Sequence, residues 1–313
     1  MADPGMGQEP ALDLAIVIVN YNTRDLLRDC LASIYASRLA CSYQVIVVDN
    51  ASRDGSADMV ASTFPQVHLL RQESNAGYAA ANNAGLCAAG FRAGQAAPRY
   101  VLLLNPDTLL QPDALTGMLE FMEAHPEAGA AGPRLVRQDG TLDRACRRSF
   151  PTPEVALYRL SGLARLFPRS RRFGRYNLDY LDPNETAEVD SLVGAFMLIR
   201  GPVLDAVGLL DERFFMYGED IDLCYRIKEQ GWRIFYYPAV TVLHYKGAAS
   251  SQRSRQSIVH FYEAMQLFHD KHYRARTFFL LNWAIRAGIA ALGAIAVLRN
   301  ELRAPARRRV ASA

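Results

Sequence analysis

Polar side chains recur at four points of the chain, each directly after a run of apolar residues. The four segments are Asn20-Tyr21-Asn22, Asp49-Asn50-Ala51-Ser52, Glu73-Ser74-Asn75-Ala76-Gly77 and Asn105-Pro106-Asp107. Carboxylate and amide oxygens of this kind bind divalent metal ions and the polar groups of a nucleotide. Asn, Asp and Ser also cap helices and form turns, which is the alternative for any one segment. Four segments at one edge of one sheet would favour a ligand site.

Three more acids, Glu219, Asp220 and Asp222, lie shortly after the aromatic run 214–217. Gly218 is expected to end one element and Glu219 to begin a helix, which puts all three acids in its first turn. Acids in that position complement the helix dipole, which is the structural alternative. An apolar wall beside a carboxylate also raises its pKa towards the range useful to a general base. The pattern makes this turn a candidate for proton abstraction.

His244 and Gly194 are single candidates, and each also has an ordinary explanation. His244 ends the predicted strand 240–244, and a lone histidine there is more often packed or exposed than a ligand unless an aspartate lies nearby. Gly194 lies within the predicted strand 189–200, which indicates the close approach of a ligand or another backbone, or else a bulge or a tight packing position.

The segments between these residues predict the elements that must position them. Apolar runs predict strands at 14–19, 43–48, 67–70, 99–104 and 232–237, and helical spacing predicts helices at 23–37, 56–64, 77–93 and 113–123, with an amphipathic piece at 155–167. This alternation is typical of an α/β fold with a mostly parallel sheet covered by helices on both faces. In such sheets the ligand lies beyond the carboxyl ends of the strands, where the four polar segments are expected.

Composition and motifs exclude several classes of protein. Half of the 313 residues are hydrophobic and 21% are charged, which is a globular and not a disordered composition. The net charge of +3 is too small to indicate nucleic-acid binding, and none is expected. The sequence contains no Walker A, GxGxxG, HExxH or GxSxG motif. The site is therefore expected to work through carboxylates and amides, with or without a metal ion.

Positive charge is concentrated in two segments, which indicates an anionic surface as a partner. Residues 271–313 hold nine Lys and Arg against Glu301, and residues 144–176 hold nine Arg against Glu154. Within the first of these, 278–298 is apolar and as a helix would reach about 30 Å. Arg286 near its middle and basic residues on both flanks disfavour a span. We expect this helix to lie in the cytoplasmic membrane surface, with packing on the domain and a single span as the alternatives.

The order and spacing of the motifs closely resemble one family. The resemblance is carried by IVIVNYN at 16–22, VVDNAS at 47–52, NAGYAAANNAG at 75–85, LLNPD at 103–107, GAFMLIR at 194–200, DERFFMYGEDIDLCYRI at 211–227 and GW…HYKG at 231–247. Over residues 13–250 the sequence is similar to inverting family-2 glycosyltransferases with the GT-A fold, a Rossmann-like arrangement. Within that family it resembles the rhamnosyltransferase-like branch that builds bacterial surface glycans.

The resemblance implies a donor site and a metal. Residues matching the donor-nucleotide side of the family are Asn20, Asp49, Asn75, Gly77, Asn83, Asn105 and Asp107. Asp49 matches the aspartate that binds the nucleobase, and Asn75 matches the amide near the ribose and phosphates. Asn105-Pro106-Asp107 stands where the family has Asp-x-Asp, so Asp107 alone is an acid there. Asp107 and His244 are the implied ligands of Mg²⁺ or Mn²⁺.

The resemblance also implies the catalytic side. Asp220 matches the family's catalytic base, and Glu219, Asp222 and Gly194 are expected to orient the base and the acceptor. The implied reaction moves a sugar from a nucleotide-sugar donor to a lipid-linked or glycan acceptor in bacterial surface polysaccharide synthesis, with dTDP-L-rhamnose as a candidate donor. A UDP-hexose donor and a non-catalytic nucleotide-sugar-binding or membrane-scaffold protein are the alternatives.

The expected organisation is a single catalytic domain with a tail. A disordered lead-in at 1–12 precedes a donor-binding half at 13–110 and an acceptor-binding half at 111–270, and a membrane-associating helix with a basic end occupies 271–313. No motif distinguishes one sugar from another.

Overall fold

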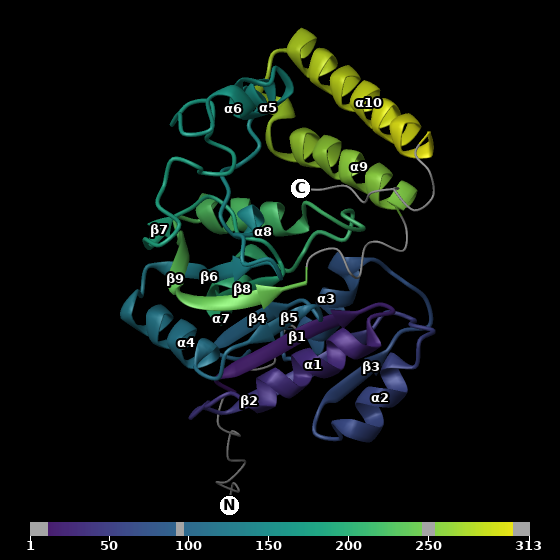
Figure 1. Ribbon diagram of the computed structural model, residues 1–313, viewed down its shortest axis with the longest axis vertical. Coiled ribbons are helices and arrows are strands. Elements are labelled where there is room, and N and C mark those ends of the chain that lie inside the picture. Colours follow the sequence, from purple (N-terminus) through teal and green to yellow (C-terminus); the bar gives the residue numbers. More distant parts are fainter. Residues whose placement is uncertain (1–11, 92–96, 246–253, 303–313) are drawn as a thin grey trace, which may run out of the picture.

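The computed structural model describes residues 12–91, 97–245 and 254–302. Within them a nine-stranded mixed sheet has the order β3-β2-β1-β4-β8-β6-β9-β5, and β7 pairs with β9 (Figure 1). The strands are β1 (Leu14–Asn20), β2 (Tyr43–Asp49), β3 (His68–Arg71), β4 (Tyr100–Leu104), β5 (Thr108–Leu110), β6 (Ala128–Val136), β7 (Ala187–Glu188), β8 (Phe196–Arg200) and β9 (Arg233–His244).

Helices cover both faces of this sheet. They are α1 (Arg24–Tyr35), α2 (Ser56–Thr63), α3 (Tyr78–Ala88), α4 (Ala114–Ala124), α5 (Pro153–Leu160), α6 (Leu163–Leu166), α7 (Gly201–Val207), α8 (Glu219–Glu229), α9 (Ser254–His272) and α10 (Phe279–Glu301), with 3-10 turns at Arg144–Cys146 and Arg274–Arg276. Both α4 and α8 pack on β6 and β9, and Figure 1 shows them on opposite sides of these strands. Residues with uncertain placement include most of the predicted lead-in, the end of the predicted helix 77–93 and the last basic residues of the tail, and these predictions lie outside the described residues.

The first half of the chain confirms the α/β prediction. β3, β2, β1 and β4 are parallel neighbours, and all seven residues of β1 are buried. A strand with apolar side chains on both faces needs cover on both, which explains the continuous apolar runs. Gly85 lets α3 approach closely, because a Cβ there would lie 2.4 Å from Val17 Cγ1. Parallel register brings the carboxyl ends of β1, β2 and β4 to one edge.

The second half of the sheet corrects two predictions and adds two strands. The predicted strand 189–200 is shortened to β8 because residue 191 pairs with residue 148 instead of with the sheet. The two strands predicted at 232–237 and 240–244 are one strand, β9, with a bulge in its register near Pro238. β5 and β6 were not predicted, since β5 has three residues and β6 is rich in Ala and Gly. β8 runs antiparallel to β4 and β6, so the sheet is mixed.

A second, smaller core forms where α9 covers α8. It contains Phe214, Ile221, Tyr225, Ala264 and Phe268. The sequence patterns did not predict α9, whose apolar stripe is weak because His, Gln and Tyr interrupt it.

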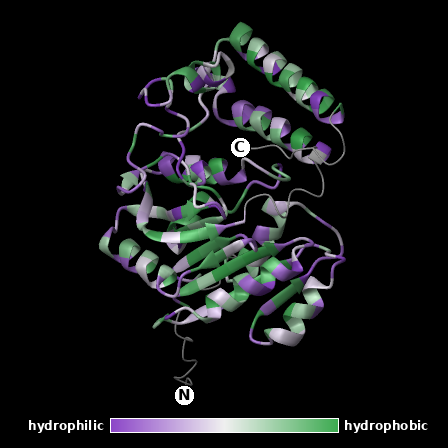
Figure 2. Cartoon of the chain, viewed as in Figure 1, coloured by the Kyte–Doolittle hydropathy of each residue, from purple (hydrophilic) through white to green (hydrophobic). Residues whose placement is uncertain are grey.

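Two polar residues of α10, Asn282 and Arg286, face α9 and contact it through polar groups. Asn282 Oδ1 lies 2.8 Å from His269 Nε2, and Arg286 Nη1 donates to Asp270 Oδ2 at 2.6 Å. The apolar side chains at the start of α10 are exposed. Figure 2 shows that much of this outermost helix is hydrophobic. The structure therefore shows this helix packed on the rest of the chain, which was one of the two alternatives to a membrane-surface helix. Its apolar surface faces outward.

Candidate active site

The carboxyl ends of β1 and β2 are joined by buried hydrogen bonds. The register pairs Asn20 with Asp49, and Asn20 Nδ2 donates to Asp49 Oδ1 at 2.9 Å. Ser52 N donates to Asp49 Oδ2 at 3.0 Å, and Thr23 Oγ1 donates to Asn20 Oδ1 at 2.6 Å. The Asp49 carboxylate is thus held in one orientation, and each of its oxygens retains accepting capacity for an N–H of a ligand.

The loop after β3 is held by Asn50, a residue without a predicted role. Asn50 Nδ2 donates to Asn75 Oδ1 at 3.0 Å and to Gly77 O at 3.2 Å, and its Oδ1 accepts from Ala76 N at 3.1 Å. Gly77 has a φ of +92°, and a Cβ there would lie 2.6 Å from the carbonyl oxygen of Phe215. Glycine is therefore required, and Asn75 and Gly77 lie at the same edge as the ends of β1 and β2.

Tyr78 connects Asn105, a residue predicted on the donor side, to Gly194, a residue predicted on the acceptor side. Its hydroxyl lies 3.0 Å from both Asn105 Oδ1 and Gly194 O. A Cβ on Gly194 would lie 3.1 Å from this hydroxyl, so the glycine allows close packing against Tyr78. Burial raises the pKa of Tyr78, and the nearby carboxyl of Glu219 raises it further. No local pattern could predict the role of Tyr78, because 116 residues separate it from Gly194.

Asn83 anchors the segment that leads to α8. Its Nδ2 donates to Leu210 O at 2.9 Å and to Glu212 Oε1 at 2.9 Å, and its Oδ1 accepts from Leu210 N at 3.0 Å. These contacts give Asn83 a positioning role. Its direct contact with a donor nucleotide stays a prediction.

Asp107 and His244 meet where β5 pairs with β9. The register pairs Thr108 with His244, and Asp107 Oδ1 lies 3.3 Å from His244 Nε2. Asp143 lies at the other ring nitrogen, with its Oδ2 3.0 Å from Nδ1. Burial opposes a charged imidazole, but hydrogen bonds to Asp107 and Asp143 raise the pKa of His244 to about 9. The adjacent aspartates distinguish His244 from an ordinary packed histidine.

These side chains fit a divalent cation. Asp107 Oδ1 is buried and lies 3.3 Å from His244 Nε2, so the two candidate ligand atoms are close together, and Asp143 orients the ring of His244. Carboxylate and imidazole suit Mn²⁺, and a carboxylate on the far ring nitrogen is the usual partner of a metal-binding histidine. A cation there would displace the imidazole proton and leave positions for water or phosphate oxygens. Among the described residues no group of three or more His, Cys, Asp or Glu side chains forms a complete metal site.

Asp220 accepts a hydrogen bond from a buried arginine that had no predicted role. Arg148 Nη2 donates to Asp220 Oδ2 at 2.7 Å and to Leu192 O at 2.7 Å. Gly194 N donates to the same carboxylate oxygen at 3.3 Å, and Ile221 N donates to Oδ1 at 2.7 Å. The position of the Asp220 carboxylate is therefore fixed both by the turn before β8 and by the segment that carries Arg148.

Glu219 is buried beside Asp220 and lacks such partners. It is 6% exposed, and its Oε2 has no hydrogen-bond partner. Burial, with a smaller contribution from the Asp220 carboxylate, raises the pKa of Glu219 to about 8. The sequence pattern predicted that apolar surroundings would raise the pKa of a carboxylate in this turn. The carboxylate whose pKa is raised is that of Glu219.

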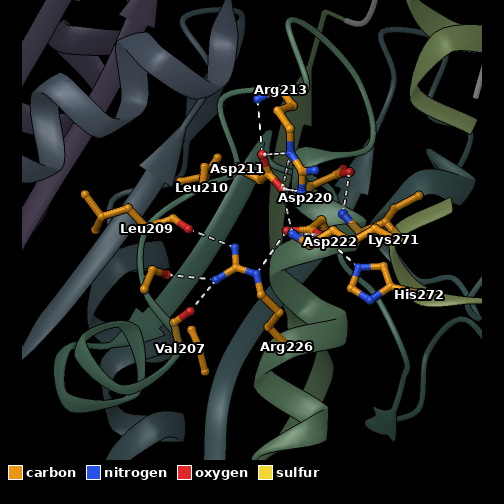
Figure 3. Close-up of polar contacts among 12 residues, drawn as sticks. Val207, Leu209, Leu210, Asp211, Arg213, Asp220, Asp222, Arg226, Lys271 and His272 are labelled. Carbon is orange, nitrogen blue, oxygen red and sulfur yellow. Dashed lines mark hydrogen bonds and ion pairs between the residues drawn. The ribbon is translucent and has the colours of Figure 1, made fainter. Parts of the chain in front are cut away.

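Asp222 faces α9. Its Oδ2 accepts from Arg226 Nε at 2.9 Å, and its Oδ1 lies 2.7 Å from both Lys271 Nζ and His272 Nε2. Lys271 also reaches Asp211 Oδ2 at 2.7 Å (Figure 3). Asp222 therefore ties the start of α8 to the end of α9. Its predicted role in orienting the acceptor stays a prediction.

The structure thus gathers most of the predicted residues at one edge of the sheet. A fixed aspartate and amides end the strands, a carboxylate and an imidazole fit a cation, and a buried carboxylate pair begins α8. This combination suits the removal of a phosphorylated leaving group, with a base to take a proton from the incoming group.

Comparison with known proteins agrees with this chemistry. Residues 10–258 match the model of a family described as glycosyltransferase-like family 2. The chain belongs to this family. It is 30% identical over 306 residues to an N-acetylglucosaminyl-diphospho-decaprenol L-rhamnosyltransferase of Mycobacterium tuberculosis, covering 95% of this chain and 96% of that protein. It is 29% identical over 148 residues to the rhamnosyltransferase WbbL of Escherichia coli, covering 47% of this chain and 52% of that protein.

Solved structures confirm the predicted fold of this glycosyltransferase. The Staphylococcus aureus TarS 1–349 structure matches with a TM-score of 0.54 at 16% identity, covering 89% of this chain and 71% of that one. The mannosyltransferase PcManGT of Pyrobaculum calidifontis, in complex with GDP-Man and Mn²⁺, matches with a TM-score of 0.55 at 18% identity, covering 93% and 76%. The resemblance to a GT-A, rhamnosyltransferase-like family-2 enzyme is confirmed.

We predict that Asp222→Ala destabilises the protein by about 3–5 kcal/mol, because it leaves Arg226 and Lys271 without their buried partner. Denaturant unfolding at pH 7 measures the change, and Asp205→Ala, an exposed change on α7, serves as the control. Burial opposes the charged form of Asp222, but hydrogen bonds from His272 and Lys271 lower its pKa below the ordinary 3.8. Its contribution is therefore present at neutral pH and is lost as the pH falls below that value. Equal stability of the two variants at pH 7 would contradict this role.

Proposed function

We propose that this glycosyltransferase transfers L-rhamnose, with inversion, from dTDP-L-rhamnose to a lipid-linked sugar acceptor in bacterial surface polysaccharide synthesis. The near full-length similarity to the mycobacterial rhamnosyltransferase supports the sugar and the acceptor class. The observation that carries the mechanism is the ionised Asp220 held by Arg148 and Gly194 N at the edge of the sheet.

The donor would lie along the carboxyl ends of β1, β2 and β4. Asp49 is oriented to accept from a base N–H, as its bonds to Asn20 and Ser52 N support. Asn75 and Gly77 would lie near the ribose and phosphates. Asn105 would also contact the donor, and the hydroxyl of Tyr78, 3.0 Å from Asn105 Oδ1, holds its side-chain amide in place.

A divalent cation, Mg²⁺ or Mn²⁺, would be held by Asp107 and His244. When bound, it neutralises charge on the departing diphosphate as a Lewis acid. Asp143 would hold the imidazole in the orientation that turns Nε2 towards Asp107. The 3.3 Å separation of Asp107 Oδ1 and His244 Nε2 supports this assignment.

Asp220 would act as the general base in a single displacement. It takes the proton of the acceptor hydroxyl, whose oxygen bonds to the anomeric carbon while the bond to the diphosphate breaks on the opposite face. The configuration at that carbon is thereby inverted. One carboxylate suffices for this step, because the leaving diphosphate needs no proton from a second acid.

The exposed apolar start of α10 would rest in the anionic cytoplasmic face of the membrane, where a lipid-linked acceptor is available. α10 is long and apolar enough to cross a membrane by length and composition. Phe279 and Trp283 are 68% and 73% exposed, and Arg286 is paired with Asp270 on α9, which supports surface attachment over a span. Burial of such aromatic side chains in lipid contributes about 1.5–3 kcal/mol each.

We predict that dTDP-L-rhamnose binds in a metal-dependent way, and that Asp107→Ala weakens binding at least about tenfold with Mn²⁺ because the cation loses a carboxylate ligand. Calorimetry with and without Mn²⁺ measures this, with Asp205→Ala as the control and UDP-glucose, UDP-GlcNAc and GDP-mannose as competing donors. Equal affinity with and without metal would contradict the metal site. Failure of all four donors to bind would favour the scaffold alternative.

We predict that Asp220→Asn lowers turnover by about 10²–10⁴-fold while the donor Kd changes less than about threefold, since an amide cannot take the proton. A radiolabel transfer assay to a polyprenyl-diphosphate-GlcNAc acceptor measures turnover, and calorimetry measures binding. Near-normal turnover by this variant would refute the base assignment.

We predict that Phe279→Asp with Trp283→Asp reduces flotation with phosphatidylglycerol vesicles at least about tenfold, because two charges replace the inserted rings. The matched control adds two charges at the exposed Gln111 and Gln138 by the same change to Asp. Unchanged flotation of the α10 variant would contradict attachment through this face.

A further inference from the structure

Two consecutive residues at the start of α8, Glu219 and Asp220, carry buried carboxyl groups. One guanidinium, that of Arg148, lies near them. Arg148 bonds Asp220 at 2.7 Å and is itself buried, with its side chain 4% exposed. Glu219 receives no bond from it, and Glu219 Oε2 has no partner although the residue is 6% exposed. Two like charges this close cannot both persist in a buried site that holds one cation. The proton therefore belongs on the carboxyl without the arginine.

We infer that Glu219 works as a neutral carboxylic acid that donates a hydrogen bond to an oxygen of the transferred sugar, while Asp220 stays ionised. A buried carboxyl oxygen without a partner costs free energy, and a ligand oxygen within reach would remove that cost. The inference rests on the proposed function for the identity of the sugar donor, but the protonation state can be measured without any donor.

The residues around Glu219 support a hydrogen bond from its carboxyl group to the donor sugar. Glu219 lies near Tyr78, since an ionised Glu219 carboxyl raises the pKa of Tyr78 more than that of Asp220 does. The Tyr78 hydroxyl lies 3.0 Å from Asn105 Oδ1 and from Gly194 O. Asp220 Oδ2 is already bonded to Arg148 and Gly194 N, whereas Glu219 Oε2 remains available to a ligand oxygen near Tyr78.

The charged groups around Glu219 all favour its neutral form or are already paired. Asp220 and Asp222 add negative charge on α8, and Arg148 is the nearby cation that opposes them. Lys271 and His272 of α9 are bonded to Asp222 and not to Glu219. Tyr78 on α3 is itself neutral, since burial raises its pKa.

Infrared difference spectroscopy of the ligand-free protein tests the protonation directly. The spectrum of wild type minus Glu219→Gln at pH 7 should contain the C=O band of a protonated carboxyl, and this band should fade as the pH rises through about 8. Glu120→Gln, an exposed change on α4, is the control and should show a carboxylate band only. Absence of a protonated-carboxyl band at pH 7 would overturn the inference whatever the donor is.

Binding and turnover then test the hydrogen bond. The affinity of wild type for dTDP-L-rhamnose with Mg²⁺ should fall up to tenfold per pH unit above about 8, because ionised Glu219 cannot donate. Glu219→Gln keeps an N–H donor, so it should bind within about threefold of wild type and lose this pH dependence. Glu219→Leu should bind at least about tenfold more weakly at pH 7.

The outcomes separate this inference from the proposed function. If wild type binds no donor but the infrared band is present, the proposed donor is wrong and the neutral Glu219 stands. If Glu219→Gln binds the donor normally but turnover falls about 10²-fold or more, Glu219 is itself the base and the inference is overturned. Equal donor affinity of the Gln and Leu variants would also overturn it.

Discussion

The buried ion pair between Arg148 and Asp220 is the interaction on which the site depends. A guanidinium that is 4% exposed and bonded at 2.7 Å cannot be removed without leaving a buried carboxylate uncompensated. The same arginine is held by the backbone pairing of residues 148 and 191 and by Leu192 O. The segment that carries Arg148, the start of α8 and the turn before β8 are therefore fixed together. This arrangement decides which of the two carboxyl groups is charged.

Further hydrogen bonds connect Asp220 to the edge of the sheet where the donor is proposed to bind. Tyr78 links Gly194, which bonds Asp220, to Asn105, which precedes the cation-fitting Asp107. On the other side, Asp222 ties α8 to Lys271 and His272, so the helix that presents the carboxyl pair is held by α9. α10 is bonded in turn to α9 through Arg286 and Asp270. The catalytic turn and the exposed apolar helix thus belong to one connected framework.

Sequence patterns predicted that several polar residues meet at one edge of the sheet, because these residues follow strands. Parallel register alone brings Asn20 beside Asp49, so the apolar runs and the polar residues after them were sufficient. The resemblance to the family added His244, which the structure places beside Asp107. The start of α8 at Glu219 was also correct, because Gly218 takes the left-handed conformation that ends the preceding element.

Long-range partners could not be predicted in the same way. Arg148 lies 72 residues from Asp220, and Asp143 lies 101 residues from His244, and neither pair has a local pattern. In the basic segment 144–176, the arginine that reaches the site cannot be distinguished by composition from the others. The short β5 and the Ala- and Gly-rich β6 have strand geometry because their neighbours pair with them. Which of Glu219 and Asp220 is the proposed hydrogen-bond donor and which is the proposed base depends on which carboxyl group Arg148 contacts.

A double-mutant cycle between Arg148 and Asp220 measures how strongly the two side chains depend on each other. Arg148→Met and Asp220→Asn are compared singly and together with wild type by denaturant unfolding at pH 7. We expect each single change to cost about 3–5 kcal/mol and the double change to cost much less than their sum, because no uncompensated charge remains. Costs that add to within about 0.5 kcal/mol would show that the two side chains act independently and that the site does not depend on this ion pair.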